Sequence, residues 1–307
     1  MRLTVLVPTY RRPDMLDGCL KAIAAQERPA DEVLVIVRDI DTETQAYLAT
    51  DPMPGLPLKA VPVTVPGQVA AMNAGLDAMT GDVVCITDDD AAPFPQWLAR
   101  IETNFEADPK LGGLGGRDWI YENGKFIGGE TDVVGKLFWY GRCIGNHHLS
   151  IPGTPQVQII KGANMSYRST AIGDLRFDTR LKGTGAQVHN DLAFAFAIQR
   201  KGWILKFDET AAVNHYIASR HDEDARYQFN PEAYFNQIYN ETFVIKEHLP
   251  AHRFAAYLLW KTIIGTRANY GLLQVLRFAP KERANAFRKF LVSLKGTAAG
   301  LRVPPSA

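Results

Sequence analysis

The chain has 307 residues, of which 46% are hydrophobic and 22% are charged. This composition is typical of a globular protein with enough chain for a sizeable core, and it excludes a disordered or fibrous chain. The charge is uneven, because residues 251–307 contain ten basic residues and one acidic residue, Glu282. An acidic body with a basic tail predicts two different partners. Nucleic acid is not expected as one of them, since no aromatic and basic recognition motif is present.

Cysteine and hydropathy patterns predict a cytoplasmic protein. The three cysteines, Cys19, Cys85 and Cys143, are scattered without metal or redox spacing, which favours reduced thiols in a cytosolic compartment. The sequence enters a strand pattern at Leu3 without a signal peptide. No apolar run approaches the roughly 20 residues that span a bilayer.

The first third of the chain alternates between short apolar runs and helical patterns. The predicted strands are Leu3–Val7, Val33–Val37, Leu58–Val63 and Asp82–Thr87. The predicted helices follow Pro13 and then cover Val69–Met79 and Pro95–Ala107. Because the strands are apolar throughout, this order predicts an α/β fold with a parallel sheet that helices cover on both faces.

The rest of the chain is less regular until its C-terminal part. Residues 111–155 are rich in glycine and aromatics without a clear period, and we expect irregular strands and loops there. Further strands are predicted at Gln156–Lys161 and Ile204–Phe207, with a helix at about Asn190–Lys201 between them. From Pro231 the pattern is helical almost to the end.

Three carboxylates, Asp88, Asp89 and Asp90, directly follow the fourth predicted strand in the stretch CITDDDAAP. Ligands of open α/β sheets bind outside the carboxyl ends of the strands. A divalent cation would relieve the repulsion between the carboxylates, and Mg²⁺ or Mn²⁺ held in this way usually completes its shell with phosphate oxygens. The triplet alone is equally consistent with a solvated acidic turn or a cap of the next helix.

Neighbouring strand ends also carry polar groups. The first strand ends in Pro8, Thr9, Tyr10, Arg11 and Arg12, and the second ends in Arg38–Asp41, which includes Asp39. A helix that begins near Gly67 places its N-terminus where it can face an anion. Together these ends predict one polar crevice with a metal and phosphate site.

Four ordered segments read VLVPTYRRP, MNAGLDAMTGDVVCITDDDAAP, KGANMSYRSTAIGDLRFDTRL and VHNDLAFAFAIQRKGWILKFDETAAVNH. Over about residues 1–216 they resemble the family 2 glycosyltransferases of the GT-A fold, which use nucleotide-sugar donors and invert the anomeric carbon. The resemblance implies a Rossmann-like, mostly parallel sheet with helices on both faces, plus a helical C-terminal region. It implies a catalytic domain at 1–216, with a nucleotide-binding half at 1–110 and an acceptor-binding half at 111–216, and a helical basic region at 217–307.

Carried over residue by residue, the resemblance implies four sets of site residues. The nucleotide-sugar site is formed by Pro8, Thr9, Tyr10, Arg12, Asp39, Asn73, Asp88 and Asp89. Asp90 and His215 are implied as the metal ligands for Mn²⁺ or Mg²⁺, and Asp191 as the general base. The acceptor side is formed by Trp139, Tyr140, Asn164 and Asn190.

The sequence departs from the family pattern at two places. The base motif, often Glu-Asp, is Asn190-Asp191, so the aspartate is kept without its acidic neighbour. The segment that often reads Ala-Arg-Asn is Ala71-Met72-Asn73, which lacks a cation that could contact the nucleotide.

Several residues also have a purely structural interpretation. Asp191 is a good helix cap, and His215 can be a buried histidine at a strand end. We expect His147 and His148 to be loop or acceptor-site groups, because adjacent residues point apart on a strand. Trp97 is expected in the core.

The basic tail contains an amphipathic pattern. If Lys281–Lys295 forms a single helix, Phe287 and Leu291 fall on one side, and Arg288 and Lys295 fall on the other. Such a helix can lie on an anionic membrane surface, or it can pack on the protein with a solvated basic face. A lipid-linked acceptor would favour the membrane, and an apolar helical tail can also form an oligomer.

The sequence therefore predicts a metal-dependent inverting glycosyltransferase of the hexosyl or N-acetylhexosaminyl type. It would move a sugar from a nucleotide-diphosphate sugar, UDP-linked, to a hydroxyl of a glycan or lipid-linked acceptor in the synthesis of a surface polysaccharide or glycolipid. The expected place is the cytoplasm, at the inner face of the membrane. The alternatives are a sugar nucleotidyltransferase, which usually needs a glycine-rich loop that Pro8–Arg12 lacks, and a non-catalytic nucleotide-sugar or glycan-binding module, which would not need Asp191.

Overall fold

A computed structural model describes residues 1–218 and 229–305, which form two compact units. The first unit contains Met1–Lys136, Ile144–Thr179 and Asp191–Ala218. The second contains Leu137–Cys143, Arg180–Asn190 and the described residues from 229 onward. Two short segments from the middle of the chain thus group with the C-terminal residues.

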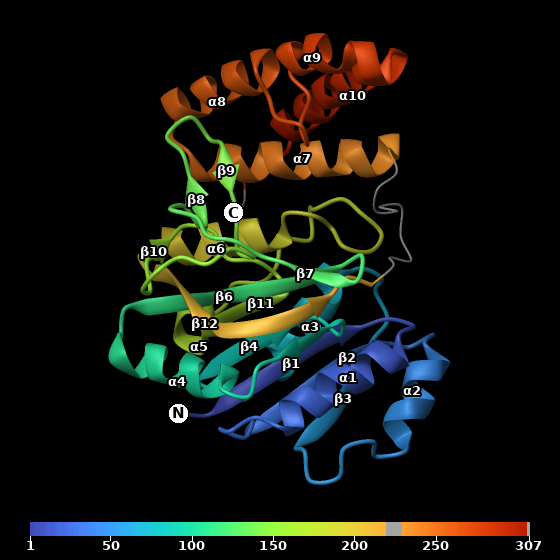
Figure 1. Cartoon of the computed structure of the whole chain (residues 1–307), viewed down its shortest axis with the longest axis vertical. Coiled ribbons are helices and arrows are strands. Elements are labelled where there is room, and N and C mark those ends of the chain that lie inside the picture. The colour runs from blue at the N-terminus through green and yellow to red at the C-terminus, as the bar shows by residue number, and fades with distance from the viewer. Residues whose placement is uncertain (219–228, 306–307) are drawn as a thin grey trace. The chain divides into compact units, whose positions relative to one another are not determined.

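A ten-stranded sheet forms the centre of the first unit in the described part of the chain (Figure 1). Its strands are β1 (Leu3–Thr9), β2 (Glu32–Arg38), β3 (Leu58–Val63), β4 (Val83–Thr87), β5 (Ala91–Pro93), β6 (Leu111–Glu122), β7 (Lys125–Ile127), β10 (Gln156–Val157), β11 (Asn164–Arg168) and β12 (Ile204–Tyr216). The order along the main path is β10-β12-β6-β11-β4-β1-β2-β3. The short strands β8 (Lys136–Leu137) and β9 (Cys143–Ile144) pair only with each other.

The directions of the strands bring the polar residues at their ends to one edge of the sheet. β1 pairs in parallel with β2 and β4, and β2 pairs in parallel with β3. β11 is antiparallel to both β4 and β6, and β12 is parallel to β6. The carboxyl ends of β1, β2, β4, β6 and β12 therefore lie at the same edge, together with the start of β11. The predicted mostly parallel α/β sheet is thus confirmed, and β11 runs antiparallel within it.

Helices pack on both faces of this sheet. The first unit contains α1 (Pro13–Ala24), α2 (Thr42–Ala49), α3 (Gln68–Ala78), α4 (Trp97–Ala107), α5 (Ser169–Ile172) and α6 (Asn190–Arg200). Side chains of α1 and α4 share one buried cluster with Val5 and Val7, and Trp97 lies fully inside it as predicted. Leu6 points to the opposite face, where a Cβ on Gly75 of α3 would lie 2.1 Å from its Cδ1. Alternation along β1 thus explains why both faces are covered.

Residues 111–155 were expected to hold irregular strands and loops, which holds for the part after Glu122, whereas the glycine-rich start forms the long central strand β6. Its glycines allow neighbouring chains to approach closely. A Cβ on Gly116 would lie 1.7 Å from the Ala211 carbonyl oxygen, and a Cβ on Gly113 would lie 2.7 Å from the Leu205 side chain. The prediction failed for β6 because these glycines serve contacts between distant segments, which leave no local pattern. The strand predicted at Gln156–Lys161 is also shorter, since only β10 is extended.

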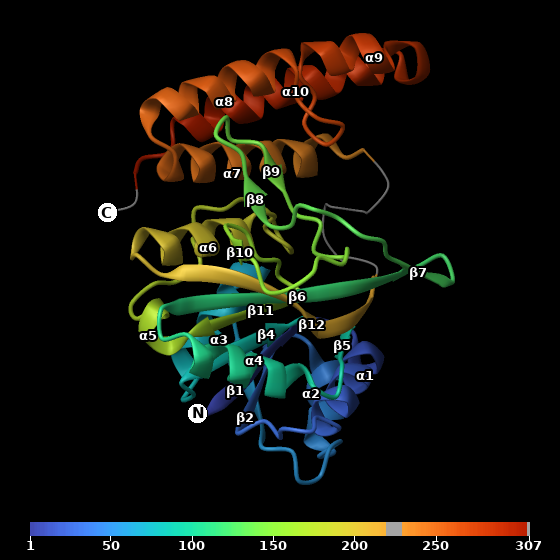
Figure 2. The same cartoon turned by 60° about the vertical axis from the view of Figure 1, so that its left-hand side comes forward.

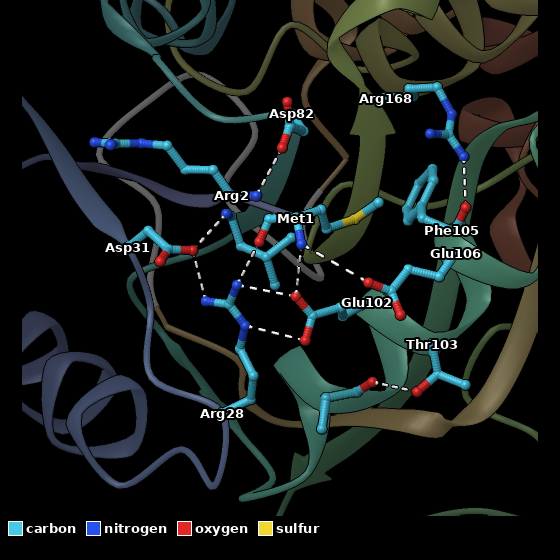
Figure 3. Close-up of polar contacts among 12 residues, drawn as sticks. Met1, Arg2, Arg28, Asp31, Asp82, Glu102, Thr103, Phe105, Glu106 and Arg168 are labelled. Carbon is cyan, nitrogen blue, oxygen red and sulfur yellow. Dashed lines mark hydrogen bonds and ion pairs between the residues drawn. The ribbon is translucent and has the colours of Figure 1, made fainter.

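An ionic cluster around Arg28 joins the start of β1 to α4 (Figure 3). The Arg28 guanidinium lies 3.0 Å from Glu102 Oε1 and 2.6 Å from Asp31 Oδ2. Asp31 also accepts a hydrogen bond from the backbone N–H of Leu3. Burial opposes ionisation of Asp31, but these partners outweigh it and lower the pKa of Asp31. The hydrogen bond from Arg28 lowers the pKa of Glu102.

Replacing Arg28 by Met is expected to lower the free energy of unfolding by about 1–2 kcal/mol at neutral pH, because a partly buried bidentate pair is lost. The two carboxyl groups have lower pKa values when folded, so their contribution is present above the unfolded values of about 4 and is lost as the pH falls through the folded values. The difference between wild type and variant should therefore shrink between about pH 5 and pH 3. Urea denaturation across this range measures it.

Lys21→Met is the matched control, since Lys21 pairs with Asp17 on an exposed helix surface. This change should cost no more than about 0.5 kcal/mol at neutral pH. An Arg28→Met variant as stable as the control would contradict a stabilising role for the cluster.

The second unit is helical from Pro231 onward, as predicted. It contains α7 (Pro231–His248), α8 (Ala251–Ile263), α9 (Leu272–Glu282) and α10 (Ala284–Leu301). Figures 1 and 2 show α8, α9 and α10 as a layer beside α7. The predicted single helix Lys281–Lys295 is wrong, because Arg283 has φ 52° and separates α9 from α10. None of the helices among the described residues is long and apolar enough to cross a bilayer.

Candidate active site

Carboxylates at the end of β4 meet polar groups from the end of β1. The register pairs Leu6 with Ile86, so that Thr9 reaches the level of Asp89. The Thr9 hydroxyl donates to Asp89 Oδ2 at 2.8 Å. The Arg12 guanidinium lies 2.8 Å from Asp89 Oδ1 and 3.5 Å from Asp90 Oδ2. The residues at the end of β1 thus contact the aspartates, as expected if these strand ends form one polar crevice.

Burial raises the pKa of two of the three aspartates. Asp89 is fully buried, and burial raises its pKa to about 7 although Arg12 opposes the shift. Burial and the neighbouring Asp90 carboxylate also raise the pKa of Asp88. Three carboxylates and one close guanidinium leave an excess of negative charge, which favours binding of a cation.

Asp88, Asp90 and His215 form a group that could hold a metal ion. Each offers one ligand atom, and these atoms lie within 4.8 Å of one another. Pairing of β5 with β12 places His215 opposite Ala91, next to the aspartates. This pairing brings together residues that are more than a hundred positions apart in the sequence.

The polar atoms of this group fit a metal ion. Asp90 Oδ1 and His215 Nε2 are buried and 3.3 Å apart, and apart from this contact neither has a polar partner within the described chain. The other Asp90 oxygen accepts a hydrogen bond from Ala218 N at 3.0 Å, which fixes the carboxylate. Two carboxylates and one imidazole are suitable ligands for Mn²⁺ or Mg²⁺.

The charge states of Asp90 and His215 depend on each other. Burial alone would raise the pKa of Asp90, but the adjacent imidazole and Arg12 hold it at about 2. Burial alone would lower the pKa of His215, but Asp90 and Asp118 raise it. Asp90 is therefore an ionised carboxylate at neutral pH and is available as a ligand.

Lys161 and Asp118 belong to this site and were missed by the sequence analysis. Lys161 Nζ lies 2.8 Å from Oδ2 of Asp118, which is fully buried. Burial alone would lower the pKa of Lys161, but Asp118, Asp88 and Asp191 outweigh it and raise that pKa. The lysine therefore interacts with the metal-ligand group and also with the predicted base. Its only signal in the sequence was its place before the Gly-Ala-Asn-Met segment.

Replacing Lys161 by Gln is expected to lower the free energy of unfolding by about 2 kcal/mol, because the buried Asp118 carboxylate loses its cation. The double variant Lys161→Gln/Asp118→Asn should recover most of this loss, since it leaves no unpaired charge. Chemical denaturation of the wild type, both single variants and the double variant measures the coupling. Additive losses would contradict a direct charge pair.

Asp191 stands in the first turn of α6 and is oriented by two backbone groups. Its Oδ2 accepts a hydrogen bond from Gly162 N at 3.3 Å, and its Oδ1 accepts one from Leu192 N at 2.8 Å. Gly162 directly follows Lys161, so the loop before β11 contacts both the base candidate and the cluster around Asp118. Asp191 thus lies in the same unit as Asp88, Asp90 and His215.

The other predicted nucleotide-site residues lie at the ends of β1 and β2, except Asn73, which lies in α3. Asp39 follows β2, is partly exposed and lies 3.4 Å from Arg38 Nε. Pro8 and Tyr10 flank Thr9, and the Arg11 guanidinium lies over the Tyr10 ring. Asn73 uses both ends of its amide on the backbone of Phe177, at 3.0 and 2.7 Å. It connects α3 to the segment after α5.

Two of the polar residues considered for the acceptor side are buried in the first unit. Asn164 accepts a hydrogen bond from Trp97 Nε1 and donates one to the Ala211 carbonyl, both at 2.8 Å. His147 Nε2 lies 2.9 Å from the Ile159 carbonyl, and burial lowers the pKa of this histidine. His148 is only partly buried. Burial and, to a smaller extent, the charge of Lys161 lower the pKa of this histidine, although Asp118 opposes the shift.

The remaining acceptor candidates lie in the second unit. Trp139 is 65% exposed, and its carbonyl accepts a hydrogen bond from Arg253. Tyr140 packs between the rings of Trp139 and Trp260. Asn190 donates hydrogen bonds from its amide to the carbonyls of Ala186 and Gln187.

Known structures share this fold. TarS 1–349 of S. aureus, solved with UDP-GlcNAc, is 16% identical, has a TM-score of 0.65, and covers 98% of this chain and 81% of its own. The mannosyltransferase PcManGT of Pyrobaculum calidifontis, solved with GDP-Man and Mn²⁺, is 17% identical, has a TM-score of 0.58, and covers 98% and 87%. At these identities the comparison shows the fold, which is of the GT-A type.

Relatives in sequence are also glycosyltransferases. An uncharacterized glycosyltransferase of Nostoc sp., alr2836, is 31% identical over 129 residues, which are 41% of this chain and 40% of the relative. A glucosyl-dolichyl phosphate glucuronosyltransferase of Haloferax volcanii is 26% identical over 154 residues, or 47% and 45%. The chain thus matches less than half the length of these relatives.

The match to the family is broader than these pairwise matches. The family model described as Glycosyl transferase family 2 matches residues 4–173, which include Thr9, the aspartate triplet and Lys161. More than half of the chain is covered, and the covered part forms most of the sheet whose edge carries the site. The chain therefore belongs to glycosyl transferase family 2.

Proposed function

We propose that this protein is a glycosyltransferase that uses a divalent cation and inverts the anomeric centre of a nucleotide-diphosphate sugar. The observation that carries the proposal is the largely buried group of Asp88, Asp90 and His215, whose ligand atoms lie within 4.8 Å of one another. Two of these atoms, Asp90 Oδ1 and His215 Nε2, contact each other and have no other polar partner in the described chain. Mn²⁺ or Mg²⁺ held there would neutralise charge on the diphosphate leaving group.

The protein's own residues divide the remaining work. Thr9 and Arg12 hold Asp89, so that the nucleotide meets an ordered strand end formed with Pro8, Tyr10 and Asp39. Lys161 adds a cation that interacts with both Asp88 and Asp191 and can counter the charge of the leaving group. Asp191 takes the proton of the acceptor hydroxyl as that oxygen attacks the sugar from the face opposite the diphosphate.

The donor and acceptor classes complete the proposal. We assign the nucleotide to residues 1–110 and the acceptor to residues 111–216, with Trp139, Tyr140, Asn164 and Asn190 on the acceptor side. A UDP-linked hexose or N-acetylhexosamine is proposed as donor, and UDP-GlcNAc in the similar TarS structure supports this nucleotide. A hydroxyl of a glycan or lipid-linked molecule is proposed as acceptor, in surface polysaccharide or glycolipid synthesis at the inner face of the cytoplasmic membrane. The dolichyl phosphate relative supports a lipid carrier.

Calorimetric titration of UDP, GDP and dTDP, with Mn²⁺ and with EDTA, tests this proposal first. One nucleotide is expected to bind only with metal, and its base then selects the donor series for measuring release of nucleoside diphosphate. Failure of all three to bind under both conditions would overturn the metal–diphosphate assignment. Binding without turnover for any donor would favour the non-catalytic module over the enzyme.

A further inference from the structure

Exposed large apolar side chains are concentrated on three helices of the second unit. On α8 they are Leu259 and Ile263, on α9 they are Leu272, Leu273 and Leu276, and on α10 they are Phe287, Leu291, Leu294 and Leu301. We call these nine residues the apolar surface. Leu276 is 66% exposed and Leu259 is 64% exposed, and a group of such side chains, unlike a single one, indicates an interaction site.

On α10 the apolar residues lie opposite the packed face. Ala286, Ser293 and Gly300 recur along one side and are buried. A Cβ on Gly300 would lie 2.7 Å from the Tyr239 carbonyl oxygen of α7, so this side packs closely on α7. Phe287, Leu291 and Leu294 lie about a third of a turn or more away from that side, as the helical repeat requires. The packed side of α10 is therefore formed by small residues, and the exposed apolar residues are not needed for packing on α7.

On α9 and α8 the arrangement is the same. Val275 of α9 is buried in a cluster with Ala286 and Phe290 of α10, while Leu272 and Leu276 face outward. On α8, Tyr257 and Lys261 are buried, and Lys261 Nζ lies 3.0 Å from Glu241 of α7. Each helix thus uses one side for packing and leaves leucine or isoleucine on another.

Cations flank the apolar residues on the same helices. Arg277 and Lys281 follow the exposed leucines of α9 around the helix, and Arg288, Lys295 and Arg302 do so along α10. All five are exposed. The single acid of residues 251–307, Glu282, lies 2.7 Å from Lys289 and does not offset them. An apolar strip with a cationic margin is typical of a helix that lies in the interface of an anionic membrane.

We propose that the outer surface of α8, α9 and α10 binds an anionic lipid bilayer. The nine apolar residues enter the boundary between headgroups and acyl chains, and the five cations contact the phosphate headgroups. A second copy of this chain is the less suitable occupant, because a symmetric contact would bring the same cationic margins together. This binding does not depend on the transfer reaction and can be tested without a donor or an acceptor.

Sedimentation with lipid vesicles tests the proposal. The full chain is expected to bind vesicles rich in phosphatidylglycerol and to bind phosphatidylcholine vesicles weakly. In a variant with Arg277, Lys281, Arg288 and Lys295 changed to Gln, affinity for the anionic vesicles should fall several hundredfold, since each cation contributes roughly fivefold near such a surface. High salt should weaken wild-type binding in the same direction.

A matched control changes Lys59, Arg100, Lys110 and Lys125 to Gln, which removes the same charge from exposed positions of the first unit. This control should bind anionic vesicles within a few-fold of wild type, because only cations near the lipid contribute directly. Equal losses in the two quadruple variants would overturn the proposed surface and would indicate an effect of net charge.

A second pair of variants tests the apolar contribution. Leu259→Glu/Leu276→Glu/Phe287→Glu should abolish vesicle binding, whereas Val65→Glu, at an equally exposed position of the first unit, should not. Light scattering and thermal unfolding of the same samples show oligomeric state and folding. If folded wild type binds neither vesicle and the triple variant dissociates an oligomer, the surface is an interface between copies and the proposal is wrong.

Metal-dependent nucleotide titration of the same samples separates this proposal from the proposed function. The lipid variants should bind nucleotide like wild type, because none of the changed residues belongs to the Asp88, Asp90 and His215 group. Loss of vesicle binding with intact nucleotide binding supports the surface. Vesicle binding by a wild type that binds no nucleotide would overturn the proposed function alone.

Discussion

Replacing Asp90 by Asn is expected to abolish metal-dependent nucleotide binding and to lower transfer by about a thousandfold. Asparagine has the same shape, so the hydrogen bond from Ala218 to the Oδ2 position can persist. What is lost is the charged oxygen that lies 3.3 Å from His215 Nε2 and has no other polar partner in the described chain. Affinity for Mn²⁺ should fall at least about a hundredfold, because a ligand is removed outright.

Calorimetry and thermal unfolding together check this result. Mn²⁺ with nucleotide should raise the melting temperature of the wild type but not that of Asp90→Asn, since a ligand stabilises only a protein that binds it. Asp132→Asn is the matched control, because Asp132 is exposed on the first unit. An Asp90→Asn variant that binds metal and nucleotide like this control would show that the triplet is a buried structural turn.

The first third of the fold could be predicted because its signals are local. The apolar run Val33–Val37 lies inside β2, and Leu58–Val63 coincides with β3. Each of these strands is buried or paired along its length, so composition and polar boundaries define it. β6 could not be found in this way, since its glycines are explained by close contacts with distant residues, such as Ala211 and Leu205 nearly a hundred positions later.

In the candidate site, too, residues with a local sequence signal could be predicted, and residues that depend on contacts between distant segments could not. The three aspartates could be predicted because they follow a strand directly, and His215 was named through a resemblance between ordered motifs. Asp118 and Lys161 could not, because their contact depends on β11 running antiparallel between β4 and β6. Neither residue has a neighbour in sequence that suggests a partner.

The basic tail illustrates how one turn changes a prediction. The apolar and basic residues of residues 281–295 were assigned to one helix, but the positive φ of Arg283 divides them between α9 and α10. Each of the two helices then has its own exposed apolar side with basic residues beside it. The amphipathic character was therefore predictable, whereas the packing of α10 on α7 through Ser293, Gly296 and Gly300 was not.

Replacing Asp191 by Asn is expected to lower the transfer rate by about a hundredfold to ten-thousandfold, because the acceptor hydroxyl loses its general base. Nucleotide and metal binding should be unchanged, since Asp191 is not part of the Asp88, Asp90 and His215 group. The variant can keep one acceptor oxygen for Gly162 N or Leu192 N, so the start of α6 should remain folded.

Measuring release of nucleoside diphosphate from the donor, beside calorimetry on the same protein, separates the two interpretations of Asp191. A loss of turnover with intact binding supports the base, and partial activity in Asp191→Glu would strengthen it because the carboxylate returns at a shifted position. If instead Asp191→Asn turns over like the wild type and only unfolds at a lower temperature, the carboxylate serves to join α6 to the loop at Gly162. In that case another group must take the proton, and Asp118 is a candidate because its partner Lys161 also interacts with Asp191.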